Sequence, residues 1–295
     1  MNVNRIRQNV LPLIAALIWG TAFVAQSVST EHVPPFAFNA ARSLVAFVAV
    51  LLLCIVRRKM GYGGKGFSRE LLVSGVCCGT ALAVASYFQQ KGLATTTPGK
   101  AGFITALYIV LVPIAGLLMG KKAPKTLLVG VPLAVAGLYC LCITEEFTVT
   151  GGDVLIFVCA FCFTVHILVI DHFSIKVDGV EMSCLQFLVC GVLSSLGAAA
   201  AETPTVEGLL LCVWPILYVG VFSSGVAYPL QIIAQKGSNP TVVSLLLSLE
   251  SVFATLAGAL ILHDRMSLKE YLGCGLMLAA VVLAQIPEKK TESRQ

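Results

Sequence analysis

The sequence predicts an all-α polytopic membrane protein with ten transmembrane helices, arranged as two inverted five-helix repeats. Three observations predict this fold class. Hydrophobic residues make up 57% of the 295 residues and charged residues only 12%, whereas a soluble domain usually carries about a quarter charged residues. The mean hydropathy is +0.90. Ten apolar runs are long enough to cross a bilayer, and patterns of the first half recur in the second half.

The ten apolar runs are close to the roughly 17–25 residues that a transmembrane helix needs. They lie at about residues 11–29, 36–56, 71–90, 98–119, 126–144, 153–173, 181–201, 208–233, 240–262 and 270–286. Short connections leave little chain for a soluble domain. The first run follows Arg5 and Arg7 and resembles a signal peptide, but it is longer than a usual signal core and has a counterpart at 153–173. We therefore expect it to remain as the first span.

The two halves of the chain, residues 1–147 and 148–295, share short stretches in the same order at a nearly constant offset. The stretches are Gln90-Lys91-Gly92 with Gln235-Lys236-Gly237 (offset 145), Pro98 and Leu107 with Pro240 and Leu249 (offset 142), and Trp19 and Arg42 with Phe163 and Gln186 (offset 144). A unit of five spans ends on the side opposite to where it began. Its second copy is therefore expected to insert upside down, as in the inverted repeats of many secondary transporters.

The distribution of basic residues predicts that both termini are cytoplasmic. With the N-terminus inside, 15 of the 20 lysines and arginines fall on cytoplasmic segments and 4 on external ones, with Arg42 inside a span. Lysine and arginine are enriched in cytoplasmic loops of membrane proteins. The loop 57–70 is then cytoplasmic, and the loops at 145–152 and 202–207 are external. The net charge of +5 comes from these inner segments, so we expect no nucleic-acid partner.

The eleven cysteines lie almost entirely within the apolar runs. Cysteine there packs as a small, soft apolar residue. A metal site needs sets of ligands at characteristic spacing, and Cys159 with Cys162 has no second pair beside it. We expect no metal and no cofactor.

Polar side chains inside the apolar runs are the candidates for function, because a polar group in hydrocarbon is costly. Glu250 is the only acid deep in a run, and Arg42 lies about 9 Å into its helix at 1.5 Å per residue. The candidates for substrate binding or coupling are Glu250, Arg42, Gln186, His166, Trp19, Asn39, Tyr87, Gln89, Tyr108 and Tyr228, and Gln26 and Gln231 are further uncharged polar residues in the runs. Each also has a structural alternative: bonding to a neighbouring helix, bracing helix ends or packing.

Several motifs resemble the EamA-type members of the drug/metabolite transporter superfamily. Leu17-Ile18-Trp19-Gly20-Thr21-Ala22-Phe23-Val24 is similar to their first helix, Arg42 to the arginine usual in their second, Pro98 through Pro113 to their fourth, and Leu249-Glu250-Ser251-Val252-Phe253 to their ninth. Ser251 stands where proline is common in the family, which puts a kink at that point in question. The resemblance covers nearly the whole chain and implies a carrier for small metabolites, often an exporter.

These observations favour a multi-pass secondary transporter in the cell membrane, surrounded by the lipid bilayer. Small metabolites such as amino acids, or drug-like compounds, are the expected substrates, and Glu250 is the expected acid for proton coupling. An uptake carrier or facilitator is the alternative. An intramembrane enzyme is disfavoured because the sequence contains no His-Glu-x-x-His, Gly-x-Ser-x-Gly or phosphate-binding glycine motif, and a channel would need a ring of filter groups. Substrate identity, transport direction, coupling ion and oligomeric state, a homodimer included, stay open.

Overall fold

The computed structural model describes residues 6–62, 66–96, 98–120, 125–142, 149–261 and 267–284. Within these ranges the regular structure is helical, without a strand. The elements are η1 (Ile6–Val10), α2 (Leu11–Ser29), α3 (Pro35–Lys59), α4 (Arg69–Leu93), α5 (Pro98–Ala106), α6 (Tyr108–Leu118), α7 (Lys125–Cys142), α8 (Gly151–Phe173), α9 (Gly179–Ala201), α10 (Val206–Leu211), α11 (Val213–Tyr218), η2 (Val219–Ala227), α12 (Tyr228–Gln235), α13 (Pro240–Leu247), α14 (Glu250–Ile261) and α15 (Leu268–Ala284). The η elements are π-helices.

Eight helical stretches in the described residues are long and apolar enough to cross a membrane. They are Gln8–Ser29, Pro35–Lys59, Arg69–Leu93, Lys100–Leu118, Gly151–Phe173, Gly179–Ala201, Val213–Gln235 and Pro240–Ala257. The fifth predicted run holds the shorter apolar stretch Leu127–Cys140, and the tenth holds α15, which has 17 described residues. The ends of the fifth, ninth and tenth predicted runs and half of the 145–152 connection lie outside the described residues.

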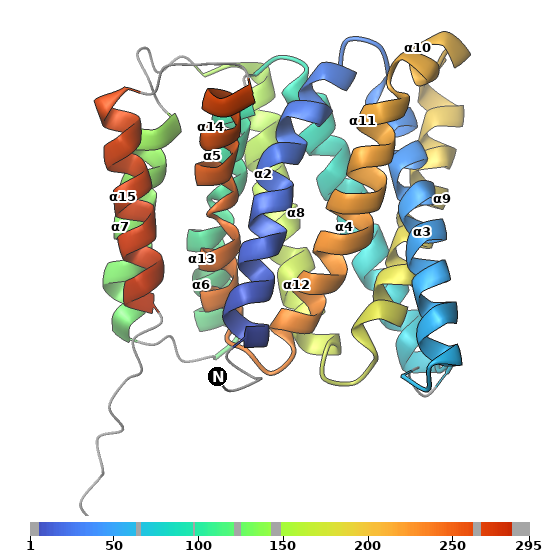
Figure 1. The fold of residues 1–295 in the computed structure, drawn as a ribbon, viewed down its shortest axis with the longest axis horizontal. Helices are drawn as coiled ribbons and strands as arrows, with labels where there is room; N and C mark the ends of the chain where they lie inside the picture. The colour runs from blue at the N-terminus through green and yellow to red at the C-terminus, as the bar shows by residue number, and fades with distance from the viewer. Residues whose placement is uncertain are drawn as a thin grey trace, which may run out of the picture.

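The eighth span begins at Val213, five residues later than the sequence predicted. Residues Val206–Leu211 form the separate short helix α10 at the upper edge of the bundle in Figure 1. Pro215 explains the break, because a proline has no N–H for the preceding turn and fits only the first turn of the new helix. Cys212 therefore ends α10 and precedes α11.

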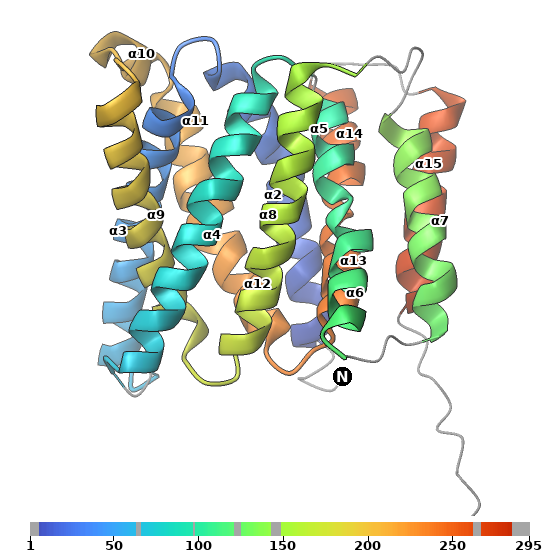
Figure 2. The ribbon, with the colours of Figure 1, turned by 180° about the vertical axis from the view of Figure 1, so that it is seen from behind.

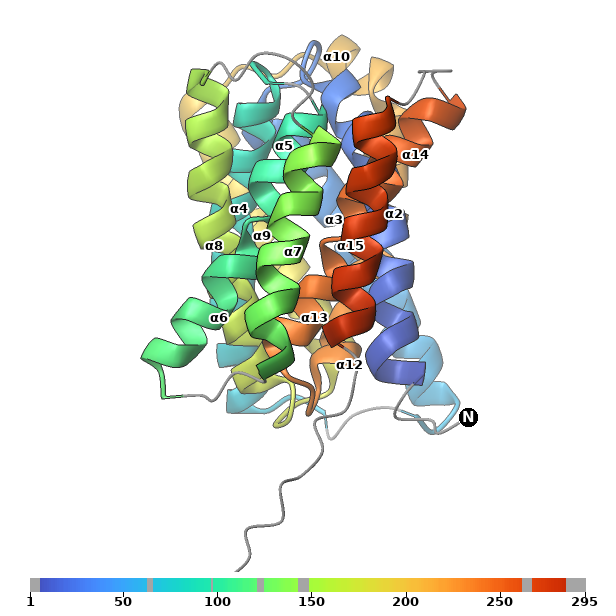
Figure 3. The ribbon, with the colours of Figure 1, turned by 90° about the vertical axis from the view of Figure 1, so that its left-hand side faces the viewer.

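The helices run up and down in one bundle, with the N-terminus at the lower edge in Figure 1. Figure 2 shows α4, α8 and α9 across the opposite face, where α4 packs on both α8 and α9. The helices α7 and α15 pack mainly against each other and stand together at one side, as Figure 3 shows. Large apolar side chains such as Leu52, Leu196 and Val282 are exposed on the outside, as expected for surfaces that face lipid.

The helices α3 and α9 are held together at both ends. At the upper end, the Glu202 carboxylate after α9 accepts hydrogen bonds of 2.9 Å each from the amides of Phe36 and Ala37 at the start of α3. At the lower end, Arg57 near the end of α3 donates two hydrogen bonds to Asp178, the N-cap of α9. Between them, Gly191 and Gly197 let the helices approach so closely that an added Cβ would meet side chains of α3 at 2.6–2.9 Å. The helices α3 and α9 together form a fixed wall of the bundle.

Two spans are interrupted near their middles, at positions that correspond in the two halves. Leu107 separates α5 from α6, and Ser248 with Leu249 separates α13 from α14. Residues 107 and 249 are the pair that the sequence repeat aligns at offset 142. The second interruption forms although Ser251 replaces a proline common in the resembling family. The Ser248 hydroxyl donates to the Leu245 carbonyl at 2.8 Å, and Leu249 bonds three residues back instead of four, which tightens the turn locally.

Candidate functional site

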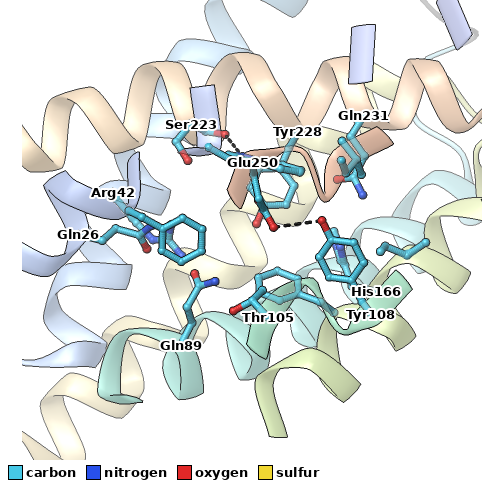
Figure 4. Close-up of a pocket in the computed structure, with 15 residues that line it drawn as sticks. Gln26, Arg42, Gln89, Thr105, Tyr108, His166, Ser223, Tyr228, Gln231 and Glu250 are labelled. Carbon is cyan, nitrogen blue, oxygen red and sulfur yellow. Dashed lines mark hydrogen bonds between the residues drawn. The ribbon is translucent and has the colours of Figure 1, made fainter. Parts of the chain in front are cut away.

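A cavity of about 40 Å³ lies inside the bundle, where the interrupted helices meet α2, α3, α4, α8 and the η2–α12 segment. It is smaller than the roughly 300–1,000 Å³ of common ligand sites, but like them it has polar groups set among apolar and aromatic side chains. The polar lining consists of Gln26, Arg42, Gln89, Thr105, Tyr108, His166, Ser223, Tyr228, Gln231 and Glu250, which Figure 4 labels. The remaining lining residues are Trp19, Phe23, Phe163, Ile167 and Leu247.

The acid of the cavity is Glu250, the first residue of α14, which is 4% exposed. The Tyr108 hydroxyl, at the start of α6, donates a hydrogen bond of 3.0 Å to its Oε1 (Figure 4). Both residues directly follow the helix interruptions, and both are aligned by the repeat at offset 142. This hydrogen bond therefore joins corresponding positions of the two halves. The N-terminus of α14 also favours a negative charge at Glu250.

The cation of the cavity is Arg42 on α3, which is 4% exposed. Its Nε donates to Asn39 Oδ1 at 2.8 Å. None of the ion pairs found among the described residues includes Arg42 or Glu250. The cavity thus contains one cation and one acid that do not neutralise each other, and each is held by a neutral side chain.

Aromatic and imidazole side chains build the rest of the wall. The Trp19 indole donates from Nε1 to the Ser223 carbonyl at 3.0 Å, and its ring meets Tyr228 edge to face at 4.9 Å between centroids. His166 Nε2 bonds Gln186 Oε1 at 3.1 Å, while Nδ1 has no hydrogen-bond partner among the described residues. That nitrogen, together with the unpartnered Gln26 Oε1, Thr105 Oγ1 and Gln231 Oε1, offers hydrogen-bonding capacity to a polar ligand.

The π-helix η2 shapes one side of the cavity. It spans Val219–Ala227 and contains Ser223, whose carbonyl accepts the hydrogen bond from the Trp19 indole. Pro229, the second residue of the following helix α12, supplies no backbone N–H. A missing donor frees a carbonyl in the preceding turn, which favours the wider π-type turn. Such turns occur frequently at functional sites of helical proteins.

The predicted site residues fall into three groups. Seven of the ten line the cavity: Glu250, Arg42, His166, Trp19, Gln89, Tyr108 and Tyr228. Asn39 and Gln186 are completely buried and do not line it, but each hydrogen-bonds a residue that does. Tyr87 is away from the cavity: its ring stacks on Phe36 at 4.1 Å, and its hydroxyl accepts a hydrogen bond from Lys91. Their roles in binding or coupling stay predictions.

Sequence reasoning did not select Phe23, Thr105, Phe163, Ile167, Ser223 and Leu247 as candidates, although all six line the cavity. The repeat carried a usable signal for one of them. Phe163 corresponds to Trp19 and Ile167 to Phe23 at offset 144, and Leu247 corresponds to Thr105 at offset 142. Aligning the candidate Trp19 with its counterpart would have found Phe163, whereas Phe23 with Ile167 and Thr105 with Leu247 correspond only to each other.

A multi-pass helical bundle with a mixed polar and aromatic cavity inside it is an architecture typical of membrane transport proteins. The sequence pattern of the EamA-like transporter family matches residues 8–143 and again 150–285. The chain therefore belongs to the EamA-like transporter family.

Similar proteins carry names of the same class. An "Uncharacterized transporter" of Archaeoglobus fulgidus is 31% identical over 92% of this chain and 84% of its own length. The "Uncharacterized inner membrane transporter YedA" of Escherichia coli strain K12 is 23% identical over 96% of this chain and 93% of its own length. A solved structure titled "Crystal structure of protein" has a TM-score of 0.76 at 19% identity, covering 94% of this chain and 96% of that one, which shows the fold alone.

Proposed function

We propose that this protein is a secondary carrier that exports a small metabolite across the cytoplasmic membrane by alternating access. In this proposal ten spans form two inverted five-helix repeats, at residues 1–147 and 148–295, with both termini cytoplasmic. The observation that carries the proposal is the cavity at the paired helix interruptions, where Tyr108 and Glu250 meet. Interrupted spans at corresponding positions of two repeats are a feature of transporter binding sites.

Two matching hydrogen bonds support the inverted repeat. Gln90 on α4 donates from Nε2 to the Gln26 carbonyl on α2 at 3.1 Å. Its counterpart Gln235 on α12 donates from Nε2 to the Ile167 carbonyl on α8 at 3.2 Å. In each half the third span thus bonds the first. Figure 1 shows α4 ending at the upper edge of the bundle and α12 ending at the lower edge, as opposite orientations require.

The unpaired charges support a coupled mechanism for a charged or polar substrate. Glu250 is buried and bonded to a neutral hydroxyl, so it is able to gain or lose a proton without breaking an ion pair. In our proposal Glu250 binds a proton from one side and releases it to the other. Arg42 binds an anionic group of the substrate, since a buried guanidinium without a carboxylate in the protein matches one in a ligand.

A transport assay tests the proposed function. A thermal-shift screen of the purified protein against a metabolite panel identifies a ligand, and proteoliposomes loaded with that ligand then take up its labelled form. We expect saturable uptake, counterflow, and a response to an imposed pH gradient that Glu250→Gln abolishes. Uptake that rises linearly with concentration and shows no counterflow would identify a channel-like facilitator and contradict the carrier.

The alternatives differ in what they require. An uptake carrier has the same architecture, because gradients and coupling set the direction, and right-side-out versus inside-out vesicles distinguish the two. An intramembrane enzyme would need an oriented acid and base. Among the described residues, His166 bonds Gln186 and Glu250 bonds Tyr108, and no hydrogen bond joins His166 with Glu250. This arrangement favours the carrier.

A further inference from the structure

The buried cation Arg42 differs in its kind of partner from the cations that form ion pairs in the described residues. Arg57 pairs with Asp178, Arg58 with Glu181 and Lys100 with Asp153, in each case through a carboxylate oxygen at 2.8–2.9 Å. Arg42 is the more buried residue and bonds the neutral amide of Asn39. Leaving a buried charge without a counter-ion is costly. The lack of a counter-ion at Arg42 therefore calls for a functional explanation.

Asn39 is connected to the cavity through its hydrogen bond to Arg42. It lies three residues earlier on α3, which puts both side chains on one face of the helix. It is 0% exposed and is not among the lining residues. Because a guanidinium only donates hydrogen bonds, the Asn39 side chain must present its oxygen to Arg42. Its Nδ2 then points elsewhere, and it has no partner among the described residues.

The position of this hydrogen bond decides which edge of the guanidinium remains for a ligand. A guanidinium grips a carboxylate in a bidentate way through its side edge, Nε with one Nη, or through its end edge, Nη1 with Nη2. Asn39 Oδ1 occupies Nε at 2.8 Å, so the side edge is already used. The end edge remains, and Figure 4 shows the Arg42 side chain reaching into the cavity.

We infer that Asn39 is a positioning residue that presents the end edge of Arg42 to an organic carboxylate and keeps its charge unneutralised. This inference rests on the proposed role of Arg42 and adds the residue that gives the site its selectivity for an anion. Asparagine suits this role because it has the shape of aspartate without the charge. An aspartate at position 39 would hold Arg42 equally well and would take the place of the ligand's own carboxylate in neutralising it.

The chain contains its own reporter for the test. Of its two tryptophans, Trp19 lines the cavity and Trp214 on α11 is 77% exposed. In a Trp214→Phe background, tryptophan fluorescence therefore reports on the cavity alone. Phenylacetate and phenylacetamide serve as probes, because they share an apolar ring and differ in whether the polar group is a carboxylate or a neutral amide. Binding is measured at equilibrium in detergent micelles, which contain no tryptophan, and without transport.

We expect the parent to bind phenylacetate more tightly than phenylacetamide. Asn39→Asp should weaken phenylacetate binding about tenfold or more, the range of a lost hydrogen bond to a charged group, and leave phenylacetamide binding unchanged. Asn39→Ala should weaken phenylacetate binding by a smaller factor. Ser183, which corresponds to Asn39 at offset 144 and is equally buried, gives the matched control: Ser183→Ala should change neither affinity.

Three results would overturn the inference. They are a parent without preference for phenylacetate, an Asn39→Asp variant that binds phenylacetate as tightly as the parent, and equal losses for both probes in folded Asn39 variants. The last pattern would mark Asn39 as a packing residue. Binding and transport are measured separately. If the protein shows counterflow but does not prefer phenylacetate over phenylacetamide, only this inference is refuted. If it prefers phenylacetate but shows no counterflow, only the proposed carrier function is refuted.

Discussion

The two halves of the molecule are alike where they hold the bundle together and different where they face the cavity. Gln90 and Gln235 occupy corresponding positions and make the same kind of hydrogen bond to a backbone carbonyl. At the cavity, position 108 is tyrosine and its counterpart is Glu250, while position 42 is arginine and its counterpart, Gln186, lies behind the cavity wall. The first half thus supplies the cation and the second half the acid. The duplicated scaffold has been kept, and the site built on it has become asymmetric.

The largest effect is expected at the acid, where the halves differ most in charge. Glu250→Gln keeps the hydrogen-bonding shape but removes the ionisable group, so transport driven by a pH gradient should fall to background in proteoliposomes while ligand counterflow persists. Tyr108→Phe is the matched control, because it removes the partner hydroxyl and keeps the acid. It should weaken coupling without abolishing it. Undiminished pH-driven transport in Glu250→Gln would remove this residue from the coupling mechanism.

A smaller effect is expected when the cation is replaced by the residue of the other half. Arg42→Gln makes position 42 identical to position 186 and removes a charge-assisted contact, so affinity for an anionic substrate should fall roughly 10–100-fold. Arg42→Lys keeps the charge without the planar fork and should recover only part of that loss. Ligand titration of the three proteins measures this order. Equal affinity in the lysine variant would show that charge suffices and the fork does not matter.

Corresponding positions that make the same contact should respond alike. Gln90→Ala and Gln235→Ala each remove one interhelical hydrogen bond, which is worth about 1 kcal/mol. Each should lower the thermal unfolding midpoint in detergent by a similar, modest amount. A large loss in one variant beside no change in the other would show that the scaffold, too, has diverged between the halves.

The smallest effect concerns the lower end of the α3–α9 wall. Burial opposes ionisation of Asp178, but hydrogen bonds from Arg57 and from the first amides of α9 hold the pKa of Asp178 below its usual value of 3.8. A lowered pKa gives stability that is complete above the usual value and is lost as pH falls through the folded-state value. Asp178→Asn should therefore cost about 1 kcal/mol or less near pH 7, and its difference from the parent should shrink below pH 4. A difference that stays constant down to pH 3 would contradict this role.

The membrane spans and the charged candidates could be predicted because hydrocarbon imposes a simple rule on sequence. A long apolar run has few alternatives to a span, and a lone acid within one, such as Glu250, is a candidate for function because burying it in hydrocarbon is costly. The rotation of each helix could not be predicted in the same way. A membrane helix is apolar towards lipid as well as towards its neighbours, so periodicity does not separate the cavity face from the others. Tyr87 was selected for this reason, and it lies away from the cavity.

Local backbone breaks were equally hidden in the sequence. The interruption at Ser248 and Leu249 depends on a serine that bonds its own helix, and no proline marks it. Asn39 and Gln186 were chosen because they are polar, but polarity does not reveal whether a side chain lines a cavity or lies one layer behind it. Their hydrogen bonds to Arg42 and His166 became visible only once the helices were packed.

The inverted relation of the two halves is the central claim, and site-directed labelling tests it most directly. Single cysteines at Lys91 and Lys236 are placed in a background without the eleven native cysteines and treated on intact cells with a membrane-impermeant thiol reagent. The two positions belong to matching Gln-Lys-Gly stretches, one within the last turn of α4 and one at the end of α12. We predict that position 91 is labelled from outside and that position 236 is labelled only after the membrane is opened. Labelling of both positions from the same side would contradict the inverted repeat and the alternating-access mechanism that depends on it.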